Sequence, residues 1–202
     1  MQDRYTRRLL VEQSDRTGEP KMRSYENQIA FLEAHNTALM GHSNQSLLDH
    51  LIGTRAILLD WNADDSLAAA GLFHSVYGTE SFRQEAVPVA LRPQVREVIG
   101  ERAEELAYTF GAMAKETFAT SVERGTDFWV EDRHTGDRIQ MDTGQWSALC
   151  ELVVANWLEQ RPRAGAEYQQ LKADMFRTLR RWLSAPASAA LSTAYGFDPE
   201  VR

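Results

Sequence analysis

The chain has few of the features that mark secreted or membrane-spanning proteins. Cys150 is the single cysteine among 202 residues, so no disulfide can form within the chain, which favours a reducing compartment. No stretch approaches the ~18 apolar residues that a membrane helix needs. The N-terminal sequence MQDRYTRRLL lacks the apolar segment of a signal peptide. We therefore expect a soluble, cytoplasmic protein.

Basic residues are also fewer than acidic ones. The chain has 29 acidic residues against 22 Lys and Arg, a formal net charge of −7. Nucleic-acid backbones and anionic membranes both attract basic surfaces. We therefore expect neither as the main partner and expect a small-molecule substrate instead. The sequence leaves a homodimer open.

Only 6 prolines and 12 glycines interrupt the chain, and apolar residues recur at helical spacing along most of it. Ser43 or Ser46 can cap one helix, and an Asp at 64 or 65 can cap the next, whose Ala and Gly residues suit a central position in a bundle. Helices are predicted over residues 25–39, 47–61, 66–78, 91–99, 101–118, 143–160, 166–183 and 186–194, with a short one at 7–13.

The β signal is confined to one hairpin, with strands at residues 128–130 and 138–141 around the turn at 133–137. No internal repeat or linker divides the chain. The sequence therefore predicts an N-terminal arm at residues 1–23 and a single all-α domain at residues 24–202, with a small β-hairpin inserted.

Four of the five histidines, His35, His42, His50 and His74, lie between residues 35 and 74. His50 and His74 fall in two predicted helices joined by a short turn, an arrangement that can bring two such side chains together. Imidazole is the commonest metal-ligating side chain and a common general base near neutral pH. The alternative is that each histidine is an ordinary hydrogen-bonded core residue.

Several motifs resemble those of the HD superfamily of metal-dependent phosphohydrolases. Asp49-His50, the helix after it and the sequence AAAGLFHS resemble the start of the hydrolase domain of RelA/SpoT stringent-response enzymes. IGERAEEL at residues 99–106 is similar to that family's next helix, and VVANWL at 153–158 to the helix that supplies its last metal ligand. The resemblance covers residues 30–160, with 127–141 as an insertion. It implies an HD-domain-like helical bundle and a metal-dependent reaction.

The sequence departs from this pattern at both ligand carboxylates. Ser75 replaces the Asp that follows the second histidine, and Asn156 stands where the last Asp would align. Ser and Asn are neutral and weaker ligands than carboxylates. Two imidazoles alone seldom hold a divalent ion, because catalytic sites commonly use three protein ligands. His42 could supply the third ligand or instead hold a substrate anion.

Three hypotheses follow. The leading one is a small-molecule enzyme that uses histidine acid–base chemistry, as in an isomerase, lyase, cyclase or hydrolase. The second is an enzyme with one Fe, Mn or Zn ion, for hydrolytic or oxygen-dependent chemistry. The third is a non-catalytic module that binds a ligand or a protein partner. The candidate residues are His50, His74 and Glu80 for catalysis; His42, Tyr77, Ser75 and Asn156 for substrate binding; and His42, His50 and His74 for a metal, if one is bound.

Overall fold

The computed structural model describes residues 23–42, 44–165 and 172–198. Residues 1–22 of the arm predicted at 1–23, with its helix at 7–13, lie outside these ranges, as does the first part of the predicted helix 166–183. The described part is mostly helical with two small antiparallel strand pairs, so the coarse all-α prediction with a small hairpin is confirmed. Its main elements are α2 (Tyr25–Ala34), β1 (Gly41–His42), β2 (Gln45–Ser46), α3 (Leu47–Asp60), α4 (Asp65–Phe73), α5 (Arg92–Ile99), α6 (Glu101–Ala112), α7 (Lys115–Arg124), β3 (Trp129–Glu131), β4 (Arg138–Gln140), α8 (Thr143–Gln160), α10 (Ala173–Leu179) and α11 (Ala185–Tyr195).

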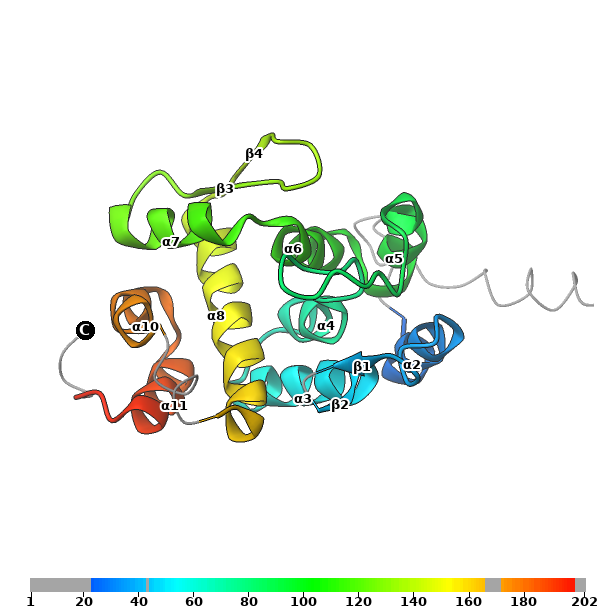
Figure 1. The fold of residues 1–202 in the computed structure, drawn as a ribbon, viewed down its shortest axis with the longest axis horizontal. Helices are drawn as coiled ribbons and strands as arrows, with labels where there is room; N and C mark the ends of the chain where they lie inside the picture. The colour runs from blue at the N-terminus through cyan, green and yellow to red at the C-terminus, as the bar shows by residue number, and fades with distance from the viewer. Residues whose placement is uncertain (1–22, 43, 166–171, 199–202) are drawn as a thin grey trace, which may run out of the picture.

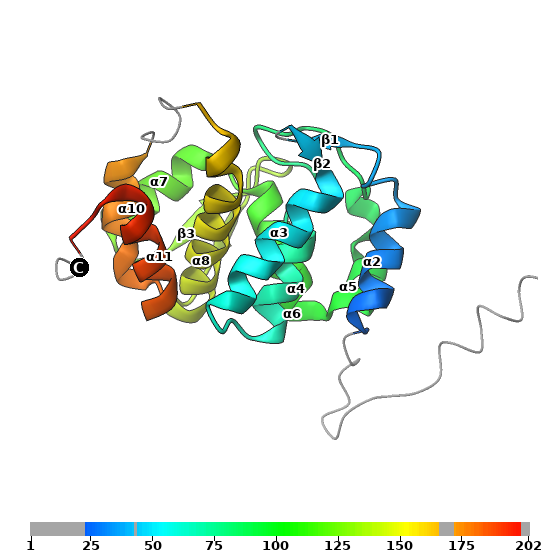
Figure 2. The same cartoon turned by 90° about the horizontal axis from the view of Figure 1, so that it is seen from below.

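Helix α8 runs through the middle of the molecule (Figures 1 and 2). It separates α3, α4 and α6 on one side from α10 and α11 on the other. Helix α4 is the most deeply packed element, because every residue from Leu67 to Phe73 is buried. A Cβ atom at Gly71 would lie 2.5 Å from the Leu58 side chain and 3.5 Å from the backbone of Arg55. The small residues therefore let α3 approach α4 closely, as the sequence predicts.

The helix starts agree with the predicted caps. The hydroxyl of Ser46, one of the two predicted caps, accepts the Asp49 backbone N–H at 3.1 Å and begins α3. The Asp64 carboxylate accepts from the Leu67 N–H at 2.8 Å and begins α4. Each cap satisfies a backbone donor that has no partner inside its helix. These caps set where His50 falls on α3 and where His74 falls at the end of α4.

Three predicted helices end earlier than expected. Helix α2 stops at Ala34 because Asn36 has a positive φ of 60°. Helix α4 stops at Phe73. The ring of His74 hydrogen-bonds the backbone carbonyl of Gly71, which would accept from the Ser75 N–H if the helix continued. The predicted helix 101–118 breaks at Met113, which is extended and bridges to Asp132 of the hairpin. In each case local or tertiary hydrogen bonds outweigh helical spacing.

The predicted hairpin is confirmed, with Trp129 opposite Gln140 and Glu131 opposite Arg138. A second pair, β1 and β2, was not predicted. It turns through Asn44 at a φ of 65° and carries His42 toward α3. Within the described residues, no helix combines the length and apolar character needed to cross a membrane.

Candidate functional site

Three side chains from three different helical segments meet in the core. His50 comes from α3, His74 from the residue after α4, and Asn156 from α8. The two Nε2 atoms of His50 and His74 lie 3.0 Å apart. The Asn156 Oδ1 atom lies 3.1 Å from the Nε2 of His50 and 3.0 Å from that of His74. We call these three residues the trio.

The hydrogen position on His74 follows from its neighbours. Its Nδ1 lies 2.7 Å from the carbonyl oxygen of Gly71, which can only accept, so Nδ1 carries the hydrogen. Burial, and secondarily the nearby His50, lower the pKa of His74 to about 3. The ring is therefore neutral at physiological pH, and its Nε2 presents a lone pair to the other two residues.

His50 is oriented by Glu159, one turn beyond Asn156 on α8. The His50 Nδ1–H donates to Glu159 Oε2, while Gln45 Nε2–H donates to Oε1 of the same carboxylate at 2.9 Å. Arg163 donates to both carboxylate oxygens, at 2.7 and 2.6 Å. Burial alone would raise the pKa of Glu159, but hydrogen bonds from His50 and Arg163 outweigh it and lower that pKa to about 2. The carboxylate is thus ionised and accepts the hydrogen that His50 carries on Nδ1.

The Asn156 amide is oriented just as firmly. Gln160 Nε2 donates to the backbone carbonyl of Asn156 at 3.1 Å, and this contact identifies the Gln160 atom as nitrogen. The same nitrogen lies 2.9 Å from the Asn156 side chain, so the atom that faces it, and the trio, is the oxygen Oδ1. The Nε2 of His74 and the Oδ1 of Asn156 are thus both acceptors, and both face the Nε2 of His50. Either a hydrogen on the Nε2 of His50 or a metal ion between the three atoms satisfies these acceptors.

His42 packs beside the trio but does not complete it. Its ring stacks on that of His50, with centroids 4.2 Å apart and planes 17° apart. Burial, and then the nearby His50, lower the pKa of His42 to about 4. Stacked rings direct their nitrogens to different points, and no three His, Cys, Asp or Glu side chains in the described part of the chain can hold a metal ion together. The described part of the chain therefore gives no support to the expected metal set of His42, His50 and His74.

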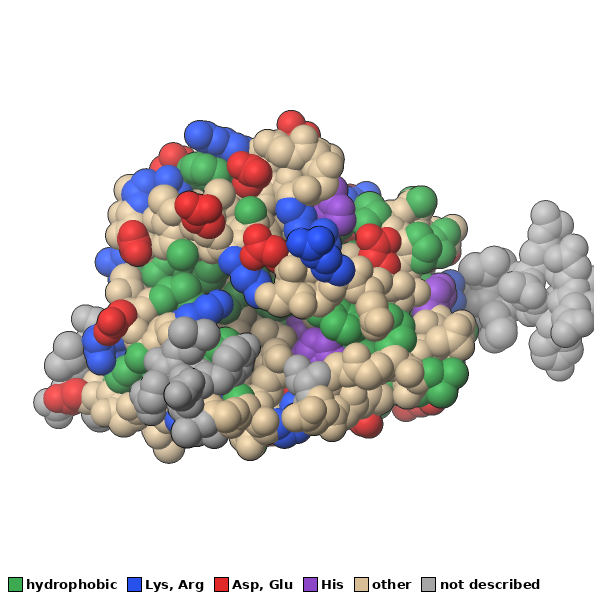
Figure 3. Space-filling view, viewed as in Figure 1, with side chains coloured by type: hydrophobic (Ala, Val, Ile, Leu, Met, Phe, Trp, Pro, Cys, Tyr) green, Lys and Arg blue, Asp and Glu red, His purple; other side chains and the backbone are tan. Residues whose placement is uncertain are grey.

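A cavity of about 800 Å³, the main cavity, reaches the trio through Asn156. Its lining also includes three other predicted residues: His42, the buried Ser75 and the exposed Glu80. The His42 Nδ1 is buried and has no hydrogen-bond partner among the described residues. Figure 3 looks into this side of the molecule, where histidine surface lies in a hollow between apolar and basic side chains. The cavity has the size of a small-molecule site.

Tyr77 does not lie on this cavity. It is fully buried, and its hydroxyl donates to Glu104 Oε1 at 3.0 Å. Arg92 and Arg96 bind the same carboxylate, with Arg92 contributing two bonds at 2.6 and 3.0 Å. Burial, and secondarily Glu104, raise the pKa of Tyr77 well above its usual range. The expectation that Tyr77 binds substrate is not supported by this position; the side chain instead belongs to a buried ionic cluster.

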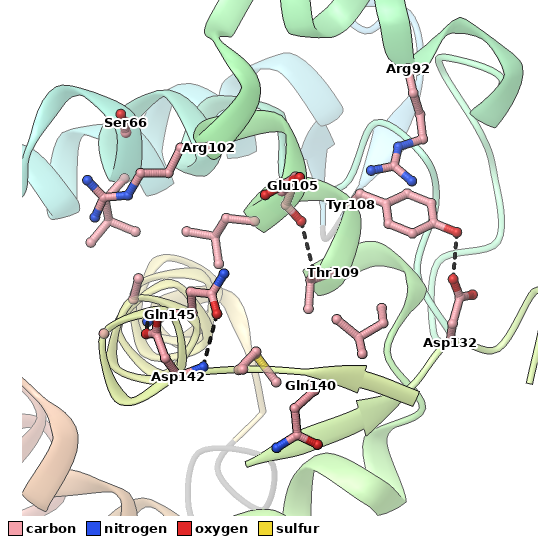
Figure 4. A pocket seen from close by; sticks show the side chains of 16 residues that line it. Ser66, Arg92, Arg102, Glu105, Tyr108, Thr109, Asp132, Gln140, Asp142 and Gln145 are labelled. Carbon is pink, nitrogen blue, oxygen red and sulfur yellow. Dashed lines mark hydrogen bonds between the residues drawn. The ribbon is translucent and has the colours of Figure 1, made fainter. Parts of the chain in front are cut away.

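A second hollow of about 560 Å³ lies between α6, the hairpin and the start of α8 (Figure 4). Several of its polar side chains already have partners. Tyr108 donates to Asp132 at 2.7 Å, the Arg92 guanidinium lies 3.6 Å from the Tyr108 ring centroid, and Arg102 pairs with Asp64 at 3.0 Å. These satisfied groups favour a structural role for this hollow.

Sequence reasoning missed Glu159, Gln45, Gln160 and Arg163. A signal for three of them was present, because residues 156, 159, 160 and 163 fall on one helical face at the spacing i, i+3, i+4 and i+7. Gln45 carried no such signal, since it reaches Glu159 through the unpredicted β1–β2 turn.

Residues 31–115 match the profile of a family described only as a domain of unknown function, DUF6817. This segment is less than half of the chain. It contains His42, His50 and His74 but ends before Asn156, so the match omits the third member of the trio. No curated protein and no solved structure matches the chain.

Proposed function

We propose that this chain is a small-molecule enzyme on an HD-like helical scaffold, with one divalent metal ion held by His50, His74 and Asn156. The observation that carries the proposal is the convergence of His50 Nε2, His74 Nε2 and Asn156 Oδ1 from α3, the end of α4 and α8. Acceptors that face one another in this way are unfavourable unless a proton or a metal ion lies between them.

The spacing of the trio supports a metal ion. Metal–nitrogen and metal–oxygen bonds are about 2.1 Å long, so two neighbouring ligands lie about 3.0 Å apart at an octahedral ion and about 3.4 Å apart at a tetrahedral one. The three separations in the trio are 3.0, 3.1 and 3.0 Å. The outer contacts also fit, because metal-binding histidines usually donate their other N–H to a carboxylate or a carbonyl. Here Glu159 and Gly71 serve those roles.

The resemblance to HD proteins points to the same residues. His50, His74 and Asn156 occupy the positions of three ligands of that family, and Ser75 the position of the fourth. Two imidazoles and an amide favour Zn, Fe or Mn over Mg, which prefers an all-oxygen set. A bound divalent ion would act as a Lewis acid on a carbonyl or phosphoryl oxygen of the substrate.

The side chains around the trio have separate roles in this proposal. Glu159 orients His50 and increases its basicity, while Arg163 and Gln45 hold that carboxylate in place. Asn156 is the member of the trio that lines the main cavity, so it marks where a substrate meets the centre. The neutral His42 lies at the cavity floor and offers its unpartnered Nδ1 to the substrate.

Metal content tests the proposal directly. Protein purified without a metal-binding tag is analysed for metals, and the metal-free form is titrated with Zn²⁺, Fe²⁺ and Mn²⁺ in a calorimeter. We expect one ion per chain, lost in His50→Ala and His74→Ala and retained in His134→Ala, a matched control in the hairpin turn. Absence of stoichiometric metal, together with no binding on titration, would refute this reading.

A second candidate is metal-free acid–base chemistry. It is favoured by the contact of His50 with the ionised Glu159, which offers a counter-charge for an imidazolium. Its Nε2–H would then donate to His74 and Asn156 and satisfy both acceptors. Nitrogen-15 NMR of the metal-free protein distinguishes the cases: a doubly protonated His50 at neutral pH supports this candidate, and a singly protonated ring contradicts it.

A further inference from the structure

The walls of the main cavity are chiefly apolar. Phe110 and Phe118 contribute from α6 and α7, Trp157 from α8, and Met175 and Phe176 from α10. Phe118 and Phe176 are 3% and 0% exposed, so these walls belong to the core of the protein. A cavity of this size and lining binds a largely apolar molecule.

Four charged side chains line the same cavity, the two carboxylates of Glu80 and Glu116 and two ammonium groups. The described residues contain two lysines, Lys115 at the start of α7 and Lys172 just before α10, and both line the main cavity. The Lys115 ammonium donates to the Ser81 hydroxyl, and that of Lys172 lies 5.5 Å from the Trp157 ring centroid. Neither forms an ion pair within 4.0 Å in the described part of the chain, although the Glu80 carboxylate is near enough to act on both.

The two ammonium groups also act on each other. Partial removal from water lowers the pKa of both, and the charge of Lys115 further lowers that of Lys172. Glu80 raises the pKa of both groups and so offsets part of this repulsion, and a bound anion would offset more of it. The two ammonium groups, which form no ion pair within 4.0 Å in the described part of the chain, can thus meet an anionic group at one end of an apolar body.

We propose that the main cavity binds an apolar molecule of medium length with one terminal anionic group, held by the ammonium groups of Lys115 and Lys172. This names the substrate class of the site proposed above and depends on that proposal for its catalytic meaning. The opposite end of the molecule would face Asn156 and His42 at the cavity floor. A carboxylate and a phosphate monoester share the required chemistry.

Four ligands with the same eight-carbon body test the charge requirement: octanoate, octyl phosphate, octanol and octylammonium. Calorimetry with the full chain in EDTA gives each Kd without metal or turnover. We expect both anions to bind more tightly than octanol and octylammonium. Their relative Kd values distinguish a carboxylate from a phosphate site. The Lys115→Met/Lys172→Met variant should weaken octanoate binding about tenfold or more and leave octanol unchanged.

Two further variants separate specific binding from general effects. Arg138→Met removes one exposed charge from the hairpin, away from the cavity, and should leave every Kd unchanged. Ala119→Trp fills the cavity and should weaken octanoate and octanol alike. The proposal is overturned if octanol binds as tightly as octanoate, if the double lysine variant binds octanoate normally, or if none of the ligands binds. None of these outcomes changes the metal content of the trio, so the two proposals fail separately.

Discussion

Replacing Glu159 with Gln tests whether this carboxylate positions His50 for a metal ion. The substitution keeps the size of the side chain and one acceptor oxygen but removes the charge that His50, Arg163 and Gln45 contact. Loss of such a carboxylate partner typically weakens metal binding about 10- to 100-fold. We therefore expect Zn²⁺ to bind Glu159→Gln that much more weakly, with one site per chain retained.

The same substitution has a cost in stability that the pKa of Glu159 sets. The difference between the ordinary value of 4.5 and about 2, at 1.36 kcal/mol per pH unit, corresponds to about 3 kcal/mol. Glutamine keeps an acceptor, so we expect a loss of about 2 kcal/mol at neutral pH. Because the native pKa is lowered, this contribution is complete above pH 4.5 and disappears as the pH falls toward 2. The difference between wild type and variant should therefore shrink below pH 4.5.

Two measurements check this prediction. Calorimetric titration with Zn²⁺ gives the affinities, and urea unfolding of the metal-free proteins at several pH values gives the free energies of unfolding. Glu151→Gln is the matched control, because it makes the same change on α8 at a buried carboxylate that accepts from the Ser184 N–H at 2.6 Å. An equal loss of Zn²⁺ affinity in both variants, or unchanged affinity in Glu159→Gln, would refute the positioning role.

Three further predictions follow from the same geometry. Asn156→Asp replaces a neutral amide with an anionic carboxylate, so the variant should bind Zn²⁺ more tightly than wild type in the same titration. Unchanged affinity would place residue 156 outside the metal site. The free energy of unfolding should fall as the pH drops from about 6.5 toward 3, because the pKa values of His42 and His74 are lowered in the folded protein. In this range the unfolded chain takes up protons that the folded chain does not. Metal-free His74→Gln should flatten this pH dependence in urea unfolding experiments. Tyr77→Phe should lower the free energy of unfolding by about 1 to 3 kcal/mol, because it removes the hydrogen bond to Glu104. The affinities for metal and for octanoate should stay unchanged. A large drop in either affinity would show that Tyr77 takes part in binding.

Local sequence signals were sufficient to predict most helices and their starts. Ser46 and Asp64 cap α3 and α4 through contacts that span only three residues, so the neighbouring sequence determines them. The break at Met113 was not predictable in this way. It depends on the bridge to Asp132 and on the hydrogen bond from Ala114 N–H to the Glu131 carbonyl, both in the hairpin. Helical spacing carries no information about such distant partners.

The candidate site was likewise predictable only in part. Helix patterns and the HD resemblance suggested His50, His74 and Asn156, and the structure brings these three together. The patterns could not show that the ring of His42 lies flat on that of His50, because this depends on a two-residue strand and the positive φ of Asn44. The patterns also could not show that Tyr77, three residues after His74, points to Glu104 and not into the main cavity.

The neutral side chains of the trio have an electrostatic consequence that links the two proposals. The trio contributes no negative charge, and the nearest carboxylate, Glu159, is already paired with Arg163. A divalent ion held there would keep most of its positive charge, unlike one neutralised by two Asp ligands. The cavity would then carry positive charge beside Asn156, in addition to the two ammonium groups that share its rim with Glu80 and Glu116. Such an ion would help to draw an organic anion into an otherwise apolar space. Asn156→Asp should therefore weaken octanoate binding in the Zn²⁺-loaded protein while it strengthens Zn²⁺ binding. If both affinities increase together, the charge of the trio does not govern the choice of ligand.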